Sequence, residues 1–392
     1  MDITNILSKK PISNNNNEGK INNKVTEQFL LDRLPMDQEN LNLDNLKDNF
    51  NKHCSKHGYT HKLPHVVSAK KFKRIIVIGD LHGDVPKTLK SLLVAGVINR
   101  AGQWIGGRTA VVQIGDQLDG CRPAHDGDNC SKDEKDYADI RVMDVLDRFH
   151  AKAVKKGGAI YSLIGNHEVM QDDDNRYISP KSYAYFNNYT DPKTGKTFRS
   201  GKAARKHAFQ PGNEYAIRLA CTRQAAIIIG SFIFVHAGIL PELAKNMDVK
   251  EINLVVRKWL LGKISSDDEI KGVGRVKDLI TNYNISPFWP RFFGQLKTNL
   301  PMSNHTCKTK LKPTLDIYQV NGMVVGHTPQ FMYGQGINST CDRKLWRVDV
   351  GMSSAFTKFT KGKAKRTRKV QVLEIKNDGR NPKKDFNILA EL

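Results

Sequence analysis

Five short turns in this sequence combine glycine with acidic, imidazole or amide side chains, and each turn follows an apolar run. In the first, Gly79-Asp80-Leu81-His82-Gly83, the aspartate and the histidine are two positions apart. In an extended backbone both side chains leave the same face and can bind one cation. A single turn of this kind is ordinary turn chemistry, but five of them predict a metal site. The other four are Gly115-Asp116-Gln117-Leu118-Asp119, Gly165-Asn166-His167-Glu168, His236-Ala237-Gly238 and Gly326-His327-Thr328.

The turns supply a candidate ligand set for two divalent ions: Asp80, His82, Asp116, Asn166, His236 and His327. Carboxylate, imidazole and amide ligands without thiolate suit Mn, Fe or Zn, and Mn is the expected metal. A carboxylate such as Asp116 can bridge two ions that lie about 3.5–4 Å apart, which favours in-line displacement at phosphorus. A hydroxide bridging the ions would then attack the phosphorus atom directly.

Two further side chains in these turns suit acid catalysis. His167 follows the candidate ligand Asn166 directly, so it is placed to protonate the leaving oxygen. Asp119, three residues after Asp116, is a candidate to orient the imidazole of His167. The predicted reaction is therefore hydrolysis of a phosphate ester with His167 as general acid.

The apolar runs before the first three turns are expected to be strands separated by helices. Residues 75–78, 111–114 and 159–164 are typical of buried strands. Between them, one helix is expected to begin at Asp84 and another to cover about 140–154. Sites in open α/β sheets form beyond the carboxyl ends of the strands, so these three turns should converge.

The last two turns belong to a second group of expected strands. Residues 227–229 and 232–235 are separated by Gly230-Ser231, which is a two-residue hairpin signal. The second strand of this hairpin runs directly into His236. Three more strands are expected at residues 323–326, 345–350 and 370–375.

Composition divides the 392 residues into a catalytic domain and two flanking segments. Residues 1–70 begin with an Asn-, Lys- and Ser-rich stretch and are expected to be a low-complexity, partly disordered extension. The catalytic domain is expected over 71–376, with a polar and basic insertion at 170–215 on the rim of the site. Residues 377–392 are expected to be a C-terminal tail.

Four histidines at four-residue spacing in the extension would line one face of a helix: His53, His57, His61 and His65. Such a set can indicate a metal site. Gly58 and Pro64 interrupt that helix, however, and no carboxylate or cysteine joins the set. A polar linker is the preferred interpretation.

Neither the apolar runs, the N-terminus nor the cysteines indicate export or a membrane partner. No run of about 18 apolar residues predicts a transmembrane helix, and residues 1–5 lack the features of a secretory signal. The six cysteines show no C-x-x-C spacing, which argues against a structural zinc site or a disulfide-stapled fold. Cys121 and Cys130 flank a polar loop and could pair, but ordinary thiols in a reducing, cytoplasmic compartment are expected.

The chain is strongly basic, with a formal net charge of +22. Such a charge attracts polyanions or phosphorylated substrates non-specifically. Basic residues gather in 193–206 and 358–369. A solvated basic surface is the plainer interpretation of both runs.

Taken together, the five turns resemble the ordered signature of calcineurin-type metallophosphoesterases, and more narrowly of the phosphoprotein phosphatase superfamily. Three further stretches resemble the Shewanella-like phosphatase branch: Phe209-Gln210-Pro211-Gly212, Ser286-Pro287-Phe288-Trp289-Pro290-Arg291 and Val348-Asp349-Val350-Gly351-Met352-Ser353. The resemblance covers about residues 70–376. It implies an α/β (α+β) fold, with a central two-sheet β-sandwich flanked by helices and a dinuclear site at its edge.

The resemblance also implies roles for individual residues. Asp80, His82 and Asp116 would hold one ion, and Asp116 would share the other with Asn166, His236 and His327. Arg291 matches a phosphate-binding arginine, a role that suits the bidentate guanidinium group.

One departure from the family pattern concerns phosphate binding. The second motif normally continues from the aspartate at position 119 into Arg-Gly, but here Gly120-Cys121-Arg122 follows. We expect Arg122, two residues later, to reach the same pocket. The alternative is a weakened site or a shifted substrate preference.

The leading hypothesis is a metal-dependent protein phosphatase acting on phosphoserine, phosphothreonine and also phosphotyrosine. A second hypothesis keeps the site but makes the substrate a nucleotide or phosphodiester, because the same two-ion clamp serves both. A third is a basic nucleic-acid-binding or scaffold protein with a relic site.

Overall fold

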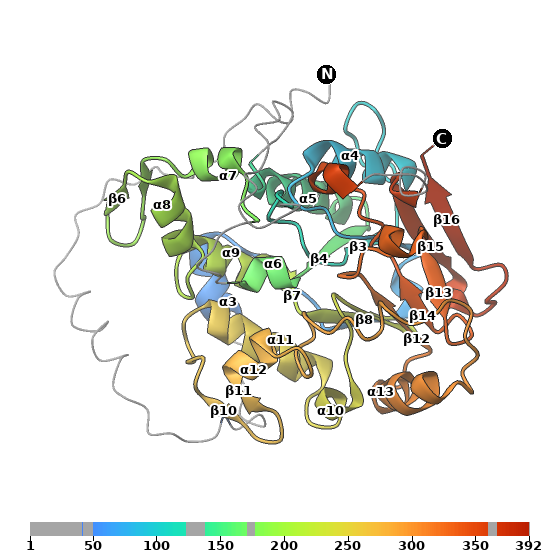
Figure 1. Ribbon diagram of the computed structural model, residues 1–392. Helices are drawn as coiled ribbons and strands as arrows, with labels where there is room; N and C mark the ends of the chain where they lie inside the picture. Colours follow the sequence, from blue (N-terminus) through green and yellow to red (C-terminus); the bar gives the residue numbers. More distant parts are fainter. Residues whose placement is uncertain (1–40, 42–49, 123–137, 171–176, 360–366, 392) are drawn as a thin grey trace.

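The computed structural model of the protein describes residues 41, 50–122, 138–170, 177–359 and 367–391. Two six-stranded sheets form its centre, and helices lie outside them (Figure 1). The expected α/β class with a central two-sheet sandwich is thereby confirmed. Among the described residues, we find no helix that is long and apolar enough to cross a membrane.

Six strands form the first sheet: β2 (Arg74–Ile78), β3 (Thr109–Gln113), β4 (Ala159–Leu163), β7 (Arg223–Gln224), β15 (Gln371–Lys376) and β16 (Phe386–Ala390). Their order in the sheet is β16-β15-β2-β3-β4-β7. The run from β2 to β7 is parallel, whereas β15 and β16 are antiparallel to their neighbours. Every residue of β3 and β4 is buried, as expected for strands covered on both faces.

Six strands form the second sheet: β1 (Val66–Val67), β8 (Ala226–Ile229), β9 (Phe232–Val235), β12 (Gly322–Val325), β13 (Asn338–Thr340) and β14 (Leu345–Arg347). Their order is β1-β8-β9-β12-β14-β13. The predicted hairpin is confirmed, because β8 and β9 pair antiparallel across Gly230-Ser231. The neighbours β9, β12 and β14 are parallel, so they deliver their carboxyl ends to one edge.

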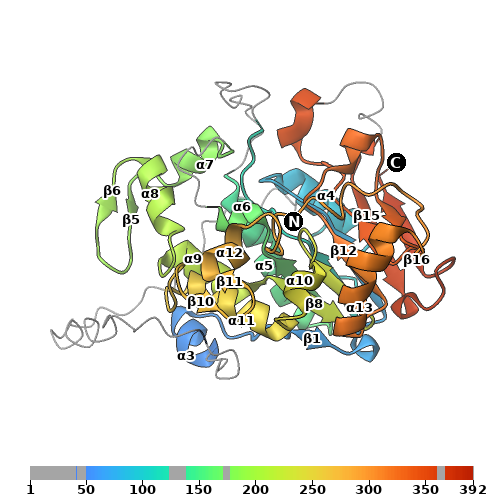
Figure 2. The same ribbon diagram turned by 60° about the horizontal axis from the view of Figure 1, so that its bottom comes forward.

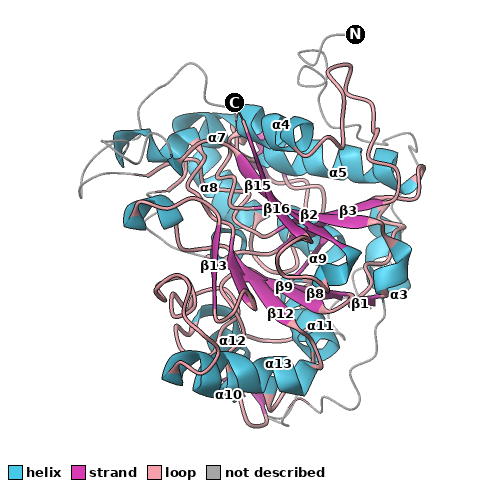
Figure 3. Cartoon of the chain, turned by 90° about the vertical axis from the view of Figure 1, so that its right-hand side faces the viewer, coloured by secondary structure: helices cyan, strands magenta, loops and turns pink. Residues whose placement is uncertain are grey.

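Helices cover the outer faces of both sheets. Beside the first sheet lie α4 (Val85–Val94) and α5 (Ile140–Val154) (Figure 3). Beside the second sheet lie α10 (Pro241–Ala244), α11 (Val249–Leu260), α12 (Val276–Thr281) and α13 (Lys312–Tyr318). Asp84 begins α4 as predicted, since its side chain accepts the Lys87 N–H. The bounds of α5 agree with the sequence prediction.

The core has two layers because β8 and β9 alternate their side chains. Ile227, Ile229 and Phe234 pack in an apolar cluster with the strands of the first sheet. Ile228 and Ile233 belong to a second cluster. That second cluster also contains apolar residues of α11 and of α9 (Glu214–Thr222). The first cluster therefore joins the two sheets and also packs α4 and α5, whereas the second packs α9 and α11.

The described part of the expected insertion is a small helical group at one side of the sheets (Figures 1 and 2). It contains α7 (Pro180–Tyr185), the pair β5 (Tyr189–Thr190) and β6 (Thr197–Phe198), and α8 (Gly201–Ala208). Residues 171–176 lie outside the described residues. The limits of the insertion and of the catalytic domain stay predictions.

Both flanking segments contribute structure. In the N-terminal extension, of which most lies outside the described residues, α3 (Phe50–Cys54) precedes β1, and β1 pairs with β8. At the other end, the expected tail contains β16, which pairs with β15 over five residue pairs. Residues 386–390 of the expected tail thus form an edge strand of the first sheet, and Phe386 and Leu389 pack on the apolar cluster between the two sheets.

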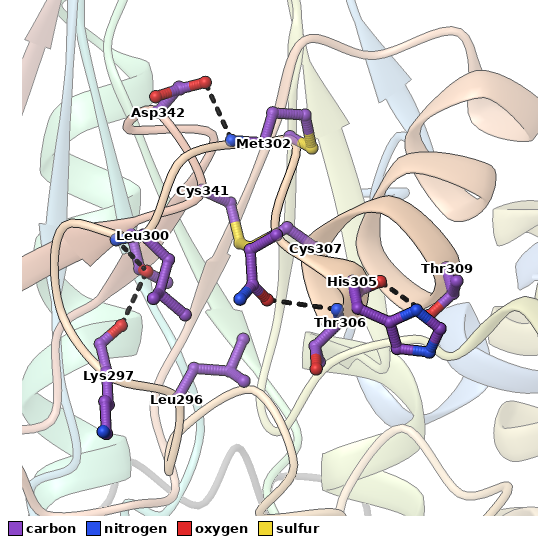
Figure 4. The surroundings of a disulfide bond; sticks show 12 residues. Leu296, Lys297, Leu300, Met302, His305, Thr306, Cys307, Thr309, Cys341 and Asp342 are labelled. Carbon is purple, nitrogen blue, oxygen red and sulfur yellow. Dashed lines mark hydrogen bonds between the residues drawn. A yellow bond between two sulfur atoms is a disulfide. The ribbon is translucent and has the colours of Figure 1, made fainter.

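The prediction of ordinary thiols is also wrong. Disulfides join Cys54 to Cys221 and Cys307 to Cys341, with Cα atoms 5.5 and 5.6 Å apart. Figure 4 shows the second bridge, next to Leu296 and Leu300. Cys121 is disulfide-bonded as well, while Cys130 lies outside the described residues. The fold brings these cysteines to bonding distance from remote positions, which spacing alone does not reveal.

Candidate active site

The turns of the two sheets meet as the sequence predicted, and backbone hydrogen bonds hold them together. The N–H of His82 donates to the carbonyl of Asp116 at 2.9 Å, which joins two turns of the first sheet. The N–H of His327 donates to Oδ2 of Asp80 at 3.0 Å, which joins the second sheet to the first. The candidate ligands therefore converge on one place.

Two glycines allow this close approach. A Cβ atom at Gly165 would lie 2.2 Å from Oδ1 of Asp116, and one at Gly326 would lie 2.4 Å from Oδ1 of Asp80. Neither carboxylate is at the end of a long flexible side chain, so neither can move away cheaply. Both positions require glycine for the carboxylates to keep their places.

Four of the candidate site residues have a left-handed backbone conformation. Their φ angles are 40° at His82, 53° at Asp116, 63° at Asp119 and 65° at His327. Conformations of this kind cost roughly 1–3 kcal/mol each in residues other than glycine, and they gather at active sites and ligand clamps. Their concentration in these turns indicates a functional site.

Two groups of side chains in the described part of the chain have metal-ligand spacing: His82, Asp116 and His167, and Asp116, His236 and His327. Asp116 belongs to both, which agrees with its predicted bridging position. Its Oδ2 lies 3.7 Å from Nε2 of His82, and its Oδ1 lies 3.4 Å from Nε2 of His236. Asn166 completes the second group, with its Oδ1 3.1 Å from Nε2 of His236.

The electrostatics of this cluster suit cations. Burial, together with the carboxylates of Asp349 and Asp116, holds the pKa of Asp80 well above its usual range. Burial also acts to raise the pKa of Asp116, but the imidazoles of His236 and His167 outweigh it and hold that pKa well below its usual range. Three buried carboxylates thus lie close together. Divalent ions fit this donor set for two reasons. Their positive charge neutralises the carboxylates, and the set offers the oxygen and nitrogen ligands that such ions prefer.

His167 and Asp119 form the pair predicted from the sequence. Nδ1 of His167 lies 2.9 Å from Oδ2 of Asp119, and the His167 side chain is 9% exposed. The backbone N–H of His167 donates to Oδ1 of Asp116 at 3.0 Å, which fixes the residue beside the candidate ligands. This is the geometry of a general acid with an orienting carboxylate.

Arg205 and Asp139 support this pair, and sequence reasoning missed both. Nη2 of Arg205, in α8, donates to Oδ1 of Asp119 at 3.0 Å and to Oδ2 of Asp139 at 2.7 Å. Asp139 also accepts the backbone N–H of Asp119. Arg205 is 86 residues from Asp119 in sequence, so no local signal connects them.

Arg122 lies at the site, although it is displaced from the usual arginine position. Its Nη2 is 2.8 Å from Nε2 of His82 and 3.0 Å from Nε2 of His167. The guanidinium group is flanked by the rings of Tyr177 and Phe356, with centroid distances of 5.1 and 5.2 Å. The longer path through Gly120 and Cys121 therefore still brings a cation to the histidines.

Arg291 lies beside the His327 turn of the second sheet. Its Nη1 donates to the carbonyl of His327 at 3.0 Å, and the residue is exposed. The adjacent Trp289 carbonyl lies 2.9 Å from Nε2 of His327. The structure thus places all ten predicted site residues at one locality.

Glu168 holds the first-sheet turns together, a role that sequence reasoning did not assign. Oε2 accepts the N–H groups of Gly165 and Asp116, and Oε1 accepts those of Gln117 and Leu118. Burial and the Asp116 carboxylate nevertheless raise the pKa of Glu168 to about 7. Its position after Asn166 and His167 was the available signal, because a glutamate at the third residue of a helix, here α6 (Asn166–Val169), can reach back to backbone N–H groups at the helix start.

A model of the calcineurin-like phosphoesterase family matches residues 73–331. The chain belongs to this family. A calcineurin-like phosphoesterase is a hydrolase, and its family implies divalent metal ions, for which the His and Asp groups described above are suited. The resemblance predicted from the five turns is confirmed.

Curated relatives and solved structures agree with this family. An uncharacterized protein, R398 of Acanthamoeba polyphaga mimivirus, is 39% identical over 60% of this chain and 96% of its own length. Shewanella-like protein phosphatase 2 of Arabidopsis thaliana is 29% identical over 72% of each chain. The structure of a cold-active protein tyrosine phosphatase matches the fold with a TM-score of 0.56 and 20% identity, over 82% of this chain and 78% of that one.

Proposed function

We propose that this phosphoesterase is a phosphoprotein phosphatase that hydrolyses phosphomonoesters of serine, threonine and tyrosine. The observation that carries the proposal is the His167–Asp119 pair beside six candidate metal ligands. Two arginines, Arg122 and Arg291, lie at the same site. The name of the Arabidopsis relative, a protein phosphatase, supports phosphoprotein as the substrate class.

Two ions, Mn by preference and Fe or Zn as alternatives, would be held by the predicted sets. Asp80, His82 and Asp116 would hold one, and Asp116, Asn166, His236 and His327 the other. When bound, the ions would supply Lewis-acid activation of water and neutralise charge on the phosphate. The protein's own contribution is the fixed position of these ligands in strained, glycine-flanked turns.

The remaining residues would handle the leaving group and the phosphate. The carboxylate of Asp119 accepts the Nδ1–H of His167, so the imidazolium form of the ring would donate its Nε2–H to the leaving oxygen. Arg205 keeps Asp119 in place. Arg122 and Arg291 would receive phosphate oxygens, for which a planar guanidinium is better suited than an ammonium group. The rings of Tyr177 and Phe356 beside Arg122 give this pocket an aromatic wall, which favours phosphotyrosine.

The proposal is tested with the full chain, loaded with Mn, and a substrate panel. Peptides carrying phosphotyrosine, phosphoserine or phosphothreonine are compared with bis(4-nitrophenyl) phosphate and a cyclic nucleotide. We expect phosphate release from the peptides to dominate, and Arg291→Lys to raise KM for them. Arg343→Lys is the matched control, since Arg343 donates only to the Pro382 carbonyl among the bonds described for it.

The second candidate, a nucleotide or phosphodiester hydrolase, is favoured by one observation. Arg122 is engaged with His82 and His167 instead of occupying the family's usual arginine position. Strong diester hydrolysis with negligible release from phosphopeptides would establish this candidate and overturn the first.

Two further predictions concern the surroundings of the protein. Non-specific contact with polyanions is proposed from the net charge of +22. The cytoplasmic location stays a prediction, and the disulfides argue against it because disulfides persist mainly in oxidising compartments.

A further inference from the structure

Asp349 is a buried carboxylate at the end of β14 that has no assigned role. Its side chain is 0% exposed. The residue follows β14 as His236 and His327 follow β9 and β12, so it reaches the same edge of the second sheet. It also touches the turn that carries Asp80: a Cβ atom at Gly79 would lie 2.3 Å from the Val348 carbonyl oxygen and 3.1 Å from Cα of Asp349.

Only one of its two carboxylate oxygens is used within the described protein. Oδ1 accepts the N–H of Gly351 at 2.8 Å. Oδ2 is buried and has no hydrogen-bond partner among the described residues. An unpaired buried polar atom is costly, and more so when the group is charged. A role in the turn accounts for Oδ1 but not for Oδ2.

Most of the charged groups that interact with Asp349 belong to the candidate metal centre. The imidazole of His236 and the guanidinium groups of Arg291, Arg122 and Arg368 attract it. Asp349 is also fully buried, so its charge is removed from water. The carboxylates of Asp80 and Asp116 repel that of Asp349, whose Oδ2 has no hydrogen-bond partner among the described residues. Such an arrangement is unfavourable unless a cation lies nearby.

We propose that Asp349 is a further carboxylate of the metal centre, and that its free Oδ2 strengthens binding of the ion held by Asp80. The inference rests on the proposed function only in requiring that divalent ions bind at this site. Asp349 acts as a positioning residue: its negative charge and free oxygen orient the ion or a water molecule bound beside it. Groups of this kind outside the main ligand set typically change metal affinity by about 10–100-fold when they are replaced.

The test is a Mn(II) titration of the metal-depleted full chain, followed by calorimetry and by electron paramagnetic resonance of the free ion. Asp349→Asn keeps an acceptor for the Gly351 N–H but removes the charge. We expect one of the two ions to bind about 10–100-fold more weakly, and the other to be unaffected. Equal affinities for both ions in the variant and the unmodified protein would overturn the proposal.

The matched control is Asp191→Asn. Asp191 is also buried, and its Oδ1 accepts the N–H of the residue two positions later, Lys193 at 3.1 Å, as Asp349 does with Gly351. It lies in the turn between β5 and β6 and contacts none of the candidate ligands in the bonds described for it. The control should bind both ions as tightly as the unmodified protein, and an equal loss in both variants would contradict the proposal.

A second variant and a second measurement separate this role from folding and from catalysis. Asp349→Ser also keeps an acceptor, and it should show the same weakened ion. Without Mn, Asp349→Asn should melt at the same temperature as the unmodified protein or higher, because a repelling charge is gone. Added Mn should raise the melting temperature of the variant by less than that of the unmodified protein.

If neither variant folds, the residue is required for the fold and the proposal is wrong. Because binding is measured directly, a lack of phosphatase activity would contradict the proposed function alone, whereas absence of Mn binding in the unmodified protein would contradict both.

Discussion

The two sheets contribute different chemistry to the same site. The turns after β2, β3 and β4 carry both candidate ligands and the groups suited to proton transfer, His167 and Asp119. The strand ends of the second sheet carry His236 and His327, with Asp349 beyond them. In the proposed function, the turns of the first sheet would combine ion binding with leaving-group chemistry and, through Arg122, phosphate binding. The strand ends of the second sheet would serve ion binding, and Arg291 reaches the His327 carbonyl from a separate loop.

Backbone hydrogen bonds join the turns of both sheets, but the first sheet adds a side chain to them. In the first, the side chain of Glu168 accepts four backbone N–H groups from two turns. In the second, backbone bonds do this work: Gly326 donates to the His236 carbonyl at 2.7 Å, and Gln330 donates to the Asp349 carbonyl at 2.8 Å. The first sheet's turns should thus be more sensitive to side-chain substitution.

The largest expected effect comes from His167→Asn, which tests the division of labour between the sheets. The variant should lower kcat by about 10²–10⁴-fold, the usual contribution of a general acid, while both Mn ions remain bound. Steady-state kinetics and metal analysis of one preparation check this. Asp119→Asn should lower kcat in the same direction, and unchanged turnover in both variants would remove this pair from the mechanism.

The disulfides give the next effect, because each supports a different region. Cys54–Cys221 ties α3 to α9 and closes a loop of sequence separation 167, whereas Cys307–Cys341 lies near β13 and β14 with a separation of 34. Serine at both positions of either bridge should lower the free energy of unfolding by about 2–5 kcal/mol. The longer loop should cost about 1 kcal/mol more on the chain-entropy account. Urea titrations would measure the order, and a reversed order would contradict it.

Glu168→Gln tests the different means of holding the turns. One carboxylate oxygen becomes an NH2 group that faces two backbone donors, so we expect a loss of about 1–3 kcal/mol in the free energy of unfolding. In the second sheet, Asp378→Asn is the counterpart, since Asp378 accepts the N–H and hydroxyl of Ser231 in the β8–β9 turn. Thermal melts should show the smaller loss for Asp378→Asn, and the opposite ranking would argue against the comparison.

The smallest effects concern helix caps. Asp84 caps α4 and also accepts the N–H of Ser354, which joins the first sheet's helix to the segment after Asp349. Asp248 caps α11 by accepting the N–H of Glu251, and this is the one bond described in which its side chain accepts. Replacement by alanine should cost about 0.5–2 kcal/mol in each case, with Asp84 toward the upper end. Equal losses would show that the bond to Ser354 contributes nothing.

Much of the fold and of the site could be predicted from local sequence patterns. The continuous apolar runs of the buried strands, the hairpin at Gly230-Ser231 and the N-cap at Asp84 depend on nearby residues alone. The convergence of the turns followed from the rule that parallel strands share an edge. The short apolar run Ile388-Leu389-Ala390 lies in the segment that was interpreted as a tail, yet it forms part of β16.

Other features could not be predicted because they depend on long-range packing. Arg205 reaches Asp119 from a helix of the expected insertion, and Cys54 meets Cys221 across 167 positions. Asp349 ends a predicted strand in the way the candidate ligands do. Its free oxygen, however, becomes evident only when the carboxylates of Asp80 and Asp116 are seen beside it.

The most direct test of the central claim, that the two sheets jointly build a two-ion phosphomonoesterase site, is one combined measurement. Mn content and phosphotyrosine-peptide turnover are determined on the same preparation as Mn is added to the metal-depleted chain. The account predicts that turnover rises with Mn and reaches its maximum at two ions per chain. Turnover that is independent of Mn, or full turnover with a single ion bound, would contradict it.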